Sequence, residues 1–306
     1  MRRLAPLFVP VMLTGVLAAC GDASETSGGG DLPEVKGAFG AKPRITVAAD
    51  SKPGKKLEST TLVEGDGPEV AKGDLLVADY LGKVYDGKVF DNSYDRGAPA
   101  AFTLKSGPGG VISGWVKALA GEKVGSRVLL VAPPKDGYGA QGNPQAGIEG
   151  TDSLVFVVDL IAAYDSSTPL PESTPVADLP KDLPDVAEGA DPDVTVAKGT
   201  APPKEPRTVV LSTGTGPEVT AGKLGIVQYT AVDWTGGPLA STWGDGPQGV
   251  PIGGQQPSPF DLLAGVPVGS RVLIELPAQE GDDAATQSIA VVIDVLGLHG
   301  PAKEKS

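Results

Sequence analysis

The side chains that most often do chemistry in enzymes are scarce in this sequence. Its 306 residues include one histidine, His299, and one cysteine, Cys20. A Ser/His/Asp or Cys/His triad of the ordinary kind is therefore excluded, as are a zinc site of Cys and His and an intramolecular disulfide. Any chemistry must come from carboxylates, hydroxyls, backbone groups or the shape of an apolar pocket, and we expect no cofactor.

The overall composition narrows the class of protein further. A formal net charge of −13, with no basic patch beyond the N-terminus, makes nucleic acid an unexpected partner. The 43 glycines and 29 prolines, with aromatic residues at only 5%, indicate many turns and short strands rather than long helices. A chain of this length is typically divided into about two domains.

The N-terminal residues have the order of an export signal. Arg2 and Arg3 precede the run "LAPLFVPVMLTGVLAA", which is too short and too interrupted by proline to span a membrane stably. The run ends in "LAAC", which resembles a bacterial lipobox, whose cysteine (here Cys20) is acylated. We expect a signal peptide over 1–19, a lipid-anchored flexible tether over 20–36, and a location on the extracytoplasmic face of the cell membrane. The alternative is an ordinary signal peptide with an incidental cysteine.

The sequence contains an internal duplication. The string "VGSRVL" occurs at Val124–Leu129 and again at Val268–Leu273, and "GDGPEVAKGDLLVADY" and "SLVFVVDL" match "GTGPEVTAGKLGIVQY" and "SIAVVIDV" in the same order. We therefore expect two tandem domains, over 37–164 (core 61–164) and 191–299, followed by a tail over 300–306. The acidic, proline-rich residues 165–190 are predicted to be an extended linker.

Each copy is predicted to consist mostly of strands. Runs such as "SRVLLVAP" and "SLVFVVDLIAAY" are apolar and end at turn residues, which is typical of buried strands, and "DLLVADYLGKVYDG" ends in a hairpin signal. One stretch differs: Trp115, Ala118 and Leu119 fall on one face of a helix. Ser113 could cap the start of this helix, and Gly121 stands where a glycine would end it. The fold class is therefore α+β, with an antiparallel sheet packed on one short helix in each domain.

Four motifs of the first copy together resemble the FKBP-type peptidyl-prolyl isomerases. They are "VADYLGKVYDGKVFDNSYDRGAPAAFTL", "VISGWVKALAGEKVGSR", "PPKDGYGAQG" and "LVFVVDL", and the resemblance extends over about residues 61–164. It implies a sheet curled around the short helix with an apolar pocket between them. It also implies an enzyme that isomerises the peptide bond before proline by desolvating and twisting the amide.

The resemblance also implies the residues of this pocket. The catalytic residues would be Tyr80, Phe90, Asp91, Ile112, Trp115, Tyr138 and Phe156, and the further substrate-pocket residues would be Val111, Phe102 and Ile148. The ring of Trp115 would form the floor, while the N–H of Ile112 and the hydroxyl of Tyr138 would bind peptide carbonyls. Two positions depart from the family pattern, since Ala100 replaces a frequent wall aromatic and Asn143 a frequent histidine.

The second copy keeps positions shared with the first but loses those of the pocket. Tyr229 matches Tyr80, and Phe260 lies within one position of the slot of Trp115. The counterparts of Phe90, Asp91, Tyr138 and Phe156 are Leu239, Ala240, Asp282 and Val291. We expect a degenerate FKBP-like domain without isomerase activity. Trp234 and Trp243 are either exposed anchors for a protein partner or fillers of its core.

Two functions follow from these observations. The first is a lipid-anchored isomerase whose first domain acts on proline-containing segments of exported proteins. The alternative is a non-catalytic lipoprotein that uses the same fold to bind proline peptides or a partner. A nutrient-binding lipoprotein is disfavoured, because nothing indicates the two large α/β lobes of that class.

Overall fold

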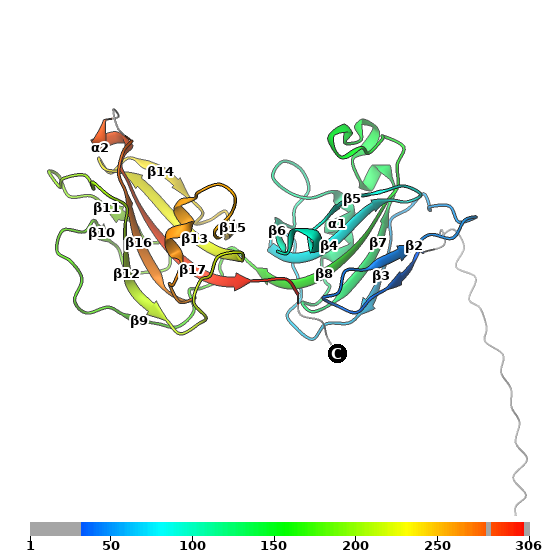
Figure 1. The fold of residues 1–306 in the computed structure, drawn as a ribbon, viewed down its shortest axis with the longest axis horizontal. Coiled ribbons are helices and arrows are strands. Elements are labelled where there is room, and N and C mark those ends of the chain that lie inside the picture. The colour runs from blue at the N-terminus through cyan, green and yellow to red at the C-terminus, as the bar shows by residue number, and fades with distance from the viewer. Residues whose placement is uncertain (1–31, 280–282, 303–306) are drawn as a thin grey trace, which may run out of the picture.

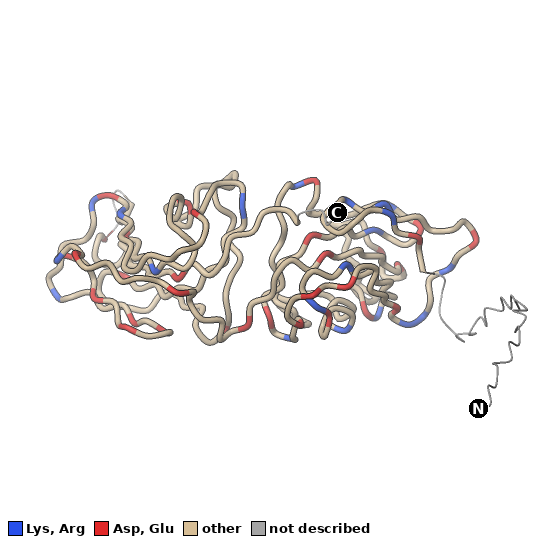
Figure 2. Tube along the Cα trace, turned by 90° about the horizontal axis from the view of Figure 1, so that it is seen from below, with Lys and Arg blue, Asp and Glu red and all other residues tan. Residues whose placement is uncertain are grey.

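The computed structural model describes residues 32–279 and 283–302. In these ranges the chain forms two β-rich halves that lie side by side, the first ending with β8 (Leu154–Tyr164) and the second with β17 (Ile289–His299) (Figure 1). Cys20, the expected signal peptide and Asp282 lie outside the described residues. Each half carries both signs of charge (Figure 2). Within the described ranges, no helix is long and apolar enough to cross a membrane.

The first half is an antiparallel sheet packed on one helix. Its strands are β3 (Glu58–Val63), β4 (Leu75–Val84), β5 (Val89–Asn92), β6 (Ala100–Thr103), β7 (Arg127–Ala132) and β8. The order is β3-β7-β8-β4, and both β5 and β6 pair with the remaining edge of β4. Alternate side chains such as Leu76 and Leu130 point to one face, where α1 (Ser113–Leu119) buries Trp115, Ala118 and Leu119 against them. This confirms the predicted helical face and the α+β class.

The opposite face of this sheet is covered by a hairpin of β1 (Glu34–Lys36) and β2 (Arg44–Thr46). Val35 and Ile45 pair across the hairpin, and both pack on the cluster that contains Leu129 and Val157. Strand β1 lies inside the segment expected to be a flexible tether, so that expectation is wrong for residues 34–36. The reason is that Val35 has apolar partners on the sheet, and their burial stabilises the ordered chain.

The second half repeats this plan. Its strands are β9 (Ser173–Pro175), β10 (Asp185–Val186), β11 (Val194–Thr195), β12 (Arg207–Gly214), β13 (Leu224–Asp233), β14 (Pro238–Ser241), β15 (Gln248–Pro251), β16 (Arg271–Leu276) and β17. The order is β14-β13-β17-β16-β12-β9, with β15 also on β13, and β10 and β11 form a hairpin. A 3₁₀ helix, η5 (Pro259–Leu263), carries the aromatic residue expected near the Trp115 slot, and α2 (Ala284–Gln287) precedes β17.

The strand registers of the two halves correspond. Arg127 pairs with Asp159 across β7 and β8, as Arg271 pairs with Asp294 across β16 and β17. Tyr80 exchanges hydrogen bonds with Ser93, whose counterparts in the second half are Tyr229 and Thr242. In this register Leu239 and Ala240 occupy the positions in the second half that are equivalent to those of Phe90 and Asp91 in the first half. Counting along the sequence predicts the same correspondence.

Residues 165–190 are not the extended linker that their composition suggests. Strand β9 pairs with β12 at the edge of the second sheet, and Leu183 and Val186 pack on the cluster around Trp234. Prolines are tolerated here because an edge strand leaves some N–H groups unpaired in any case. The apolar residues between the prolines find partners on the sheet. This segment is therefore largely part of the second half.

The two tryptophans of the second half have different surroundings. Trp234 is only 6% exposed, packs in an apolar cluster and donates from Nε1 to the carbonyl of Thr200 at 3.1 Å. It therefore fills the core and is not an exposed anchor. Trp243 is half-buried and lines a cavity.

The halves meet through equivalent positions. Leu75 and Val77 at the start of β4 pack in one cluster with Leu224 and Ile226 at the start of β13. The last residues of the two long strands also meet, with Tyr164 Oη 2.6 Å from His299 Nε2. Burial lowers the pKa of His299 and raises the pKa of Tyr164 to about 12. The pair is thus a neutral imidazole hydrogen-bonded to a protonated phenol.

We predict that acid weakens this contact. The pKa of His299 in the folded protein lies below its unfolded value of 6.5, so stability is complete above pH 6.5 and is lost as the pH falls through the folded pKa. Calorimetric unfolding between pH 7.5 and 5 should show a larger fall in unfolding temperature for the wild type than for His299→Gln, which has no group titrating there. Equal pH dependence in the two proteins would contradict the assignment.

Candidate active site

A cavity of about 340 Å³ lies beside α1 in the first half. All of the predicted pocket residues except Ile148 line it, and their list reads Tyr80, Phe90, Asp91, Phe102, Val111, Ile112, Trp115, Tyr138 and Phe156. They come from β4, β5, β6, β8, the two residues just before α1, α1 itself and the loop after η2 (Pro134–Asp136). Residues far apart in the sequence are thus brought together by the strand order of a single sheet.

The cavity is lined by aromatic rings in edge-to-face contact. The ring of Trp115 lies 5.5 Å from that of Tyr80, 5.2 Å from Phe102 and 5.5 Å from Phe156, with interplanar angles of 75° to 89°. Phe90 extends the array through Phe156 at 5.6 Å. This geometry stabilises each ring beyond its burial alone and holds the walls rigid.

Gly82 makes room for two of these rings. A Cβ at this position would lie 2.7 Å from Phe156 and 2.8 Å from Phe90, closer than any side chain can approach. Any larger residue at this position, opposite Asp91 on β4, would therefore displace both rings. In the second half Ala231 pairs with Ala240 at the same point, where the neighbouring residues are smaller.

A charged network stands at one wall of the pocket. Tyr80 donates its hydroxyl hydrogen to Asp91, and Arg96 donates to Asp91 and, at 2.9 Å, to the Tyr80 oxygen. Burial, with the Asp91 carboxylate next in importance, raises the pKa of Tyr80 to about 12. The phenol therefore stays protonated at neutral pH, and its only role is as a hydrogen-bond donor or an apolar wall.

Arg96 is the residue of this site that sequence reasoning missed. It ends the 3₁₀ helix η1 (Tyr94–Arg96), and Gly97 then turns the chain in the left-handed region at φ 69°. The turn directs the guanidinium back over the Tyr80 ring, 5.4 Å from its centroid. An arginine five positions after Asp91 in a tight turn was the available signal.

Three hydrogen-bond donors of residues that line the pocket have no partner among the described residues. The N–H of Ile112 and the hydroxyl of Tyr138 make no hydrogen bond, and Tyr138 is 38% exposed. Nε1 of Trp115 is buried and also unpaired. A buried donor without a partner, such as Trp115 Nε1, costs free energy, and the Ile112 N–H and the Tyr138 hydroxyl are available to a ligand carbonyl.

The loop that carries Tyr138 is tied to α1 through Asp136. This buried carboxylate accepts from Ser113 Oγ at 3.3 Å and from Lys117. Ser113 is therefore not the helix cap that its position suggests, because Asp136 takes its hydroxyl and Ile112 occupies the N-cap position. Gly121, by contrast, follows the helix with φ 92°, as expected of a C-terminal glycine.

Ile148 does not line the cavity. It is 3% exposed and packs in the core, and its backbone forms a two-way bridge with Asn143. The prediction that it borders the pocket is wrong, because this bridge closes η4 (Pro144–Ala146) into a turn that buries the side chain. Asn143 instead fixes that turn, since its Oδ1 accepts from the Ala146 N–H at 3.4 Å.

Comparisons with known proteins agree with this geometry. The family model described as FKBP-type peptidyl-prolyl cis-trans isomerase matches residues 67–161. An FK506-binding protein of Streptomyces anulatus is 37% identical over 122 residues, which are 40% of this chain and 96% of that protein. The chain belongs to the FKBP-type peptidyl-prolyl cis-trans isomerase family.

Larger members of the family match over part of their length. FkpA of Escherichia coli (strain K12) is 40% identical over 130 residues, 41% of this chain and 45% of FkpA. Mip of Coxiella burnetii is 40% identical over 128 residues, 40% of this chain and 53% of Mip. The chain thus spans about half the length of these relatives. The crystal structure of E. coli FkpA aligns at 40% identity over 35% of this chain and 47% of its own, with a TM-score of 0.32.

The corresponding region of the second half lacks most of the FKBP site. Tyr229 still contacts an aromatic ring, that of Phe260, at 5.7 Å. The other walls are aliphatic, with Leu239 at 51% exposure, Ala240 and Val291. The carboxylate that binds the phenol in the first half has no counterpart here.

We predict that Gly82→Ala strains the pocket. The added methyl group must displace Phe90 and Phe156, which should lower the free energy of unfolding by about 1–3 kcal/mol. Urea unfolding followed by tryptophan fluorescence measures this. The reciprocal change Ala231→Gly in the second half is the matched control and should cost less. An equal effect of the two changes would show that the rings do not require glycine.

Proposed function

We propose that the first half is a peptidyl-prolyl cis-trans isomerase that acts on exported proteins. The observation that carries this proposal is the rigid aromatic cavity with unpaired donors at Ile112, Trp115 and Tyr138, within the segment that the family model matches. The cavity has the apolar character needed for a proline ring, and the three donors belong to residues that line it.

The reaction needs no nucleophile. Rotation about a peptide bond is opposed by about 18–20 kcal/mol of resonance, which also places negative charge on the amide oxygen. The planar amide loses more solvation than the twisted one when it leaves water, because the twisted amide has less charge transfer. An apolar pocket therefore binds the twisted state better than the planar state, and that difference lowers the barrier.

The side chains of the first half would divide this work. The rings of Phe90, Trp115 and Phe156 would exclude water from the proline. The N–H of Ile112 and the Tyr138 hydroxyl would hold neighbouring carbonyls, so that the chain stays bent while the bond turns. Arg96 would keep Asp91 and Tyr80 in place. Without a catalyst the step takes tens to hundreds of seconds, long enough to limit folding.

The isomerase activity can be tested on the full chain with a chromogenic prolyl tetrapeptide. Phe90→Ala should lower kcat/KM about tenfold to a hundredfold, because burying a Phe contributes about 1.5–3 kcal/mol and 1.4 kcal/mol is about a factor of ten. The matched change in the second half, Leu239→Ala, should leave kcat/KM unchanged. Circular dichroism would check that both variants fold.

The same assay decides between the two candidate functions. An inactive, folded wild type that still binds proline peptides would support the alternative of a non-catalytic binding protein. Loss of activity in Leu239→Ala but not in Phe90→Ala would assign catalysis to the second half instead.

The proposal includes a lipid anchor on the extracytoplasmic face of the membrane. Arg2 and Arg3, the apolar run after them and "LAAC" support it. Two anchoring signals are usually needed for stable attachment, and acylation of a lipobox cysteine supplies more than one chain. An isomerase held there would meet proteins as they leave the export machinery.

We expect Cys20→Ser to abolish incorporation of labelled palmitate and to release the protein from the membrane fraction of a bacterial expression host. Val16→Leu, a conservative change within the apolar run, should preserve both. Unchanged labelling in Cys20→Ser would contradict the anchor, and it would leave the isomerase proposal standing.

A further inference from the structure

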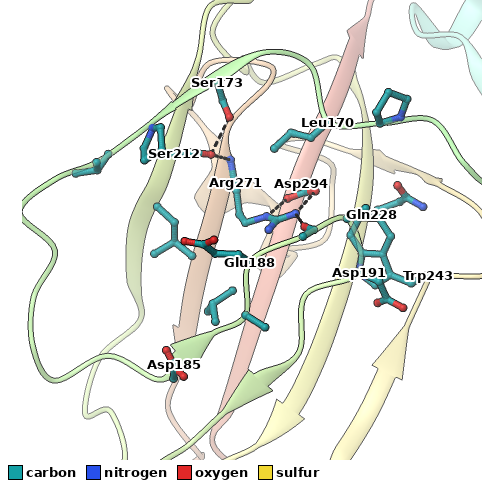
Figure 3. A pocket seen from close by; sticks show the side chains of 18 of the residues that line it. Leu170, Ser173, Asp185, Glu188, Asp191, Ser212, Gln228, Trp243, Arg271 and Asp294 are labelled. Carbon is teal, nitrogen blue, oxygen red and sulfur yellow. Dashed lines mark hydrogen bonds and ion pairs between the residues drawn. The ribbon is translucent and has the colours of Figure 1, made fainter.

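The second half contains a cavity of about 1140 Å³ that the FKBP site does not explain. It lies between the segment that follows β8 and the second sheet (Figure 3). Its lining residues Arg271 and Asp294 alternate along their strands with Val272 and Ile293, which pack on the η5 side, so the cavity is on the opposite face. Apolar side chains such as Leu170 and Val176 line it together with Gln228, Trp243 and Arg271.

Several polar groups of this cavity lack partners within the described ranges. Gln228 is fully buried, yet its Oε1 accepts no hydrogen bond, and Nε1 of Trp243 is buried without an acceptor. Arg271 binds Asp294 through Nε at 2.7 Å and Nη2 at 2.9 Å and donates from Nη2 to the Gly189 carbonyl at 2.8 Å. Its Nη1 remains unused. Buried groups such as Gln228 Oε1 and Trp243 Nε1 are normally satisfied, so their state points to a missing ligand, and the partly exposed Nη1 of Arg271 is free to bind it as well.

In the first half a loop of the N-terminal hairpin covers the position equivalent to this cavity. This loop, Gly37–Ala41, closes over the equivalent ion pair of Arg127 and Asp159. Nη1 of Arg127 donates to the Gly37 carbonyl at 2.6 Å and Nη2 to the Ala41 carbonyl at 2.7 Å, while the Gly40 N–H donates to Asp159 at 2.7 Å. Phe39, at the tip of the loop, is 7% exposed.

The second half has a shorter loop at this point. Nine residues separate the paired Val35 and Ile45 of the first hairpin, whereas seven separate Val186 and Val194 of the second. No aromatic residue stands between Val186 and Val194, and the loop residues 187–191 are all exposed. The inserted ring and the glycine N–H of the first half therefore have no counterpart in the second.

We propose that this cavity binds a loop of a partner protein that presents an aromatic residue followed by glycine. The ring would enter beside Leu170 and Trp243. The glycine N–H would donate to Asp294, and a backbone carbonyl would accept from the free Nη1 of Arg271. The Trp243 N–H and Gln228 Oε1 would bind further backbone groups.

Charge at the rim selects the partner further. The lining includes Asp185, Glu188 and Asp191, all exposed. The loop of the first half carries Lys36 and Lys42 on either side of its aromatic residue. A partner loop with basic residues at these positions would therefore complement the rim. The proposed site is on the opposite face of the sheet from the degenerate FKBP pocket, and it is independent of isomerase activity.

The internal duplication supplies a probe for this site. A peptide with the sequence of residues 34–46, closed by a disulfide between added terminal cysteines, copies the hairpin of the first half. We expect it to bind the full chain saturably and to shift the indole N–H resonance of Trp243, which Trp243→Phe assigns. A peptide with Phe39→Ala should bind with an affinity lower by about tenfold or more, because it loses the buried ring.

A loop graft tests the same proposal from the protein side. Replacing residues 187–193 by the residues 36–44 of the first half restores the missing length and ring within the second half. This variant should no longer bind the peptide and should unfold at a higher temperature than the wild type. A control graft with alanine in place of the phenylalanine should retain more of the peptide binding and should raise the unfolding temperature by less.

Each outcome decides the matter. Absence of saturable binding by the wild type would overturn the proposal, and so would equal affinity for the phenylalanine and alanine peptides. Binding that survives the phenylalanine graft would place the peptide elsewhere and would also overturn it. Loss of isomerase activity would have no bearing on these results.

Discussion

A buried ion pair on neighbouring strands constrains each half of this protein. Arg127 and Asp159 are both 0% exposed in their side chains, and they stand in register on β7 and β8. Removing two such charges from water costs several kcal/mol for each unless their hydrogen-bonding capacity is filled. In the first half the Gly37–Ala41 loop fills it, which obliges the N-terminal hairpin to cover the sheet. In the second half Arg271 is 13% exposed, and burial raises the pKa of Asp294 even beside it.

The two halves differ in opposite ways on the two faces of their sheets. The first half keeps an open pocket beside α1 and a closed outer face. In the second half aliphatic residues stand in place of Phe90, Asp91 and Phe156, while the outer face lacks the inserted ring of the Gly37–Ala41 loop and has a cavity instead. Because the sheet separates the faces, one can change without disturbing the other. A duplicated domain can thus change the chemistry of each face separately and keep its core.

Patterns local to one element were predictable from the sequence, and contacts between elements were less so. Apolar runs bounded by turn residues located the strands, helical spacing located the buried face of α1, and the aromatic residues of the motifs met as expected. Composition misled at residues 165–190, where isolated leucines and valines find apolar partners that no local pattern reveals. Ser113 and Ile148 were misplaced because a distant carboxylate and a backbone bridge decide their directions. Arg96 was missed because its role depends on a turn geometry.

The contact between the halves ties the two copies into one unit. The segment that leaves β17 crosses to the first half, where the Ala302 N–H donates to Asp79, while the segment that leaves β8 crosses to the second, where Ser166 accepts from Gln228. Strand β15 of the second half thereby lies beside β6 of the first half. Gln248 and Phe102 line the same groove of about 280 Å³. Since Phe102 also lines the candidate active site, a peptide that extends beyond the proline pocket would meet the second half. The degenerate copy thus shapes the approach to the pocket of the first.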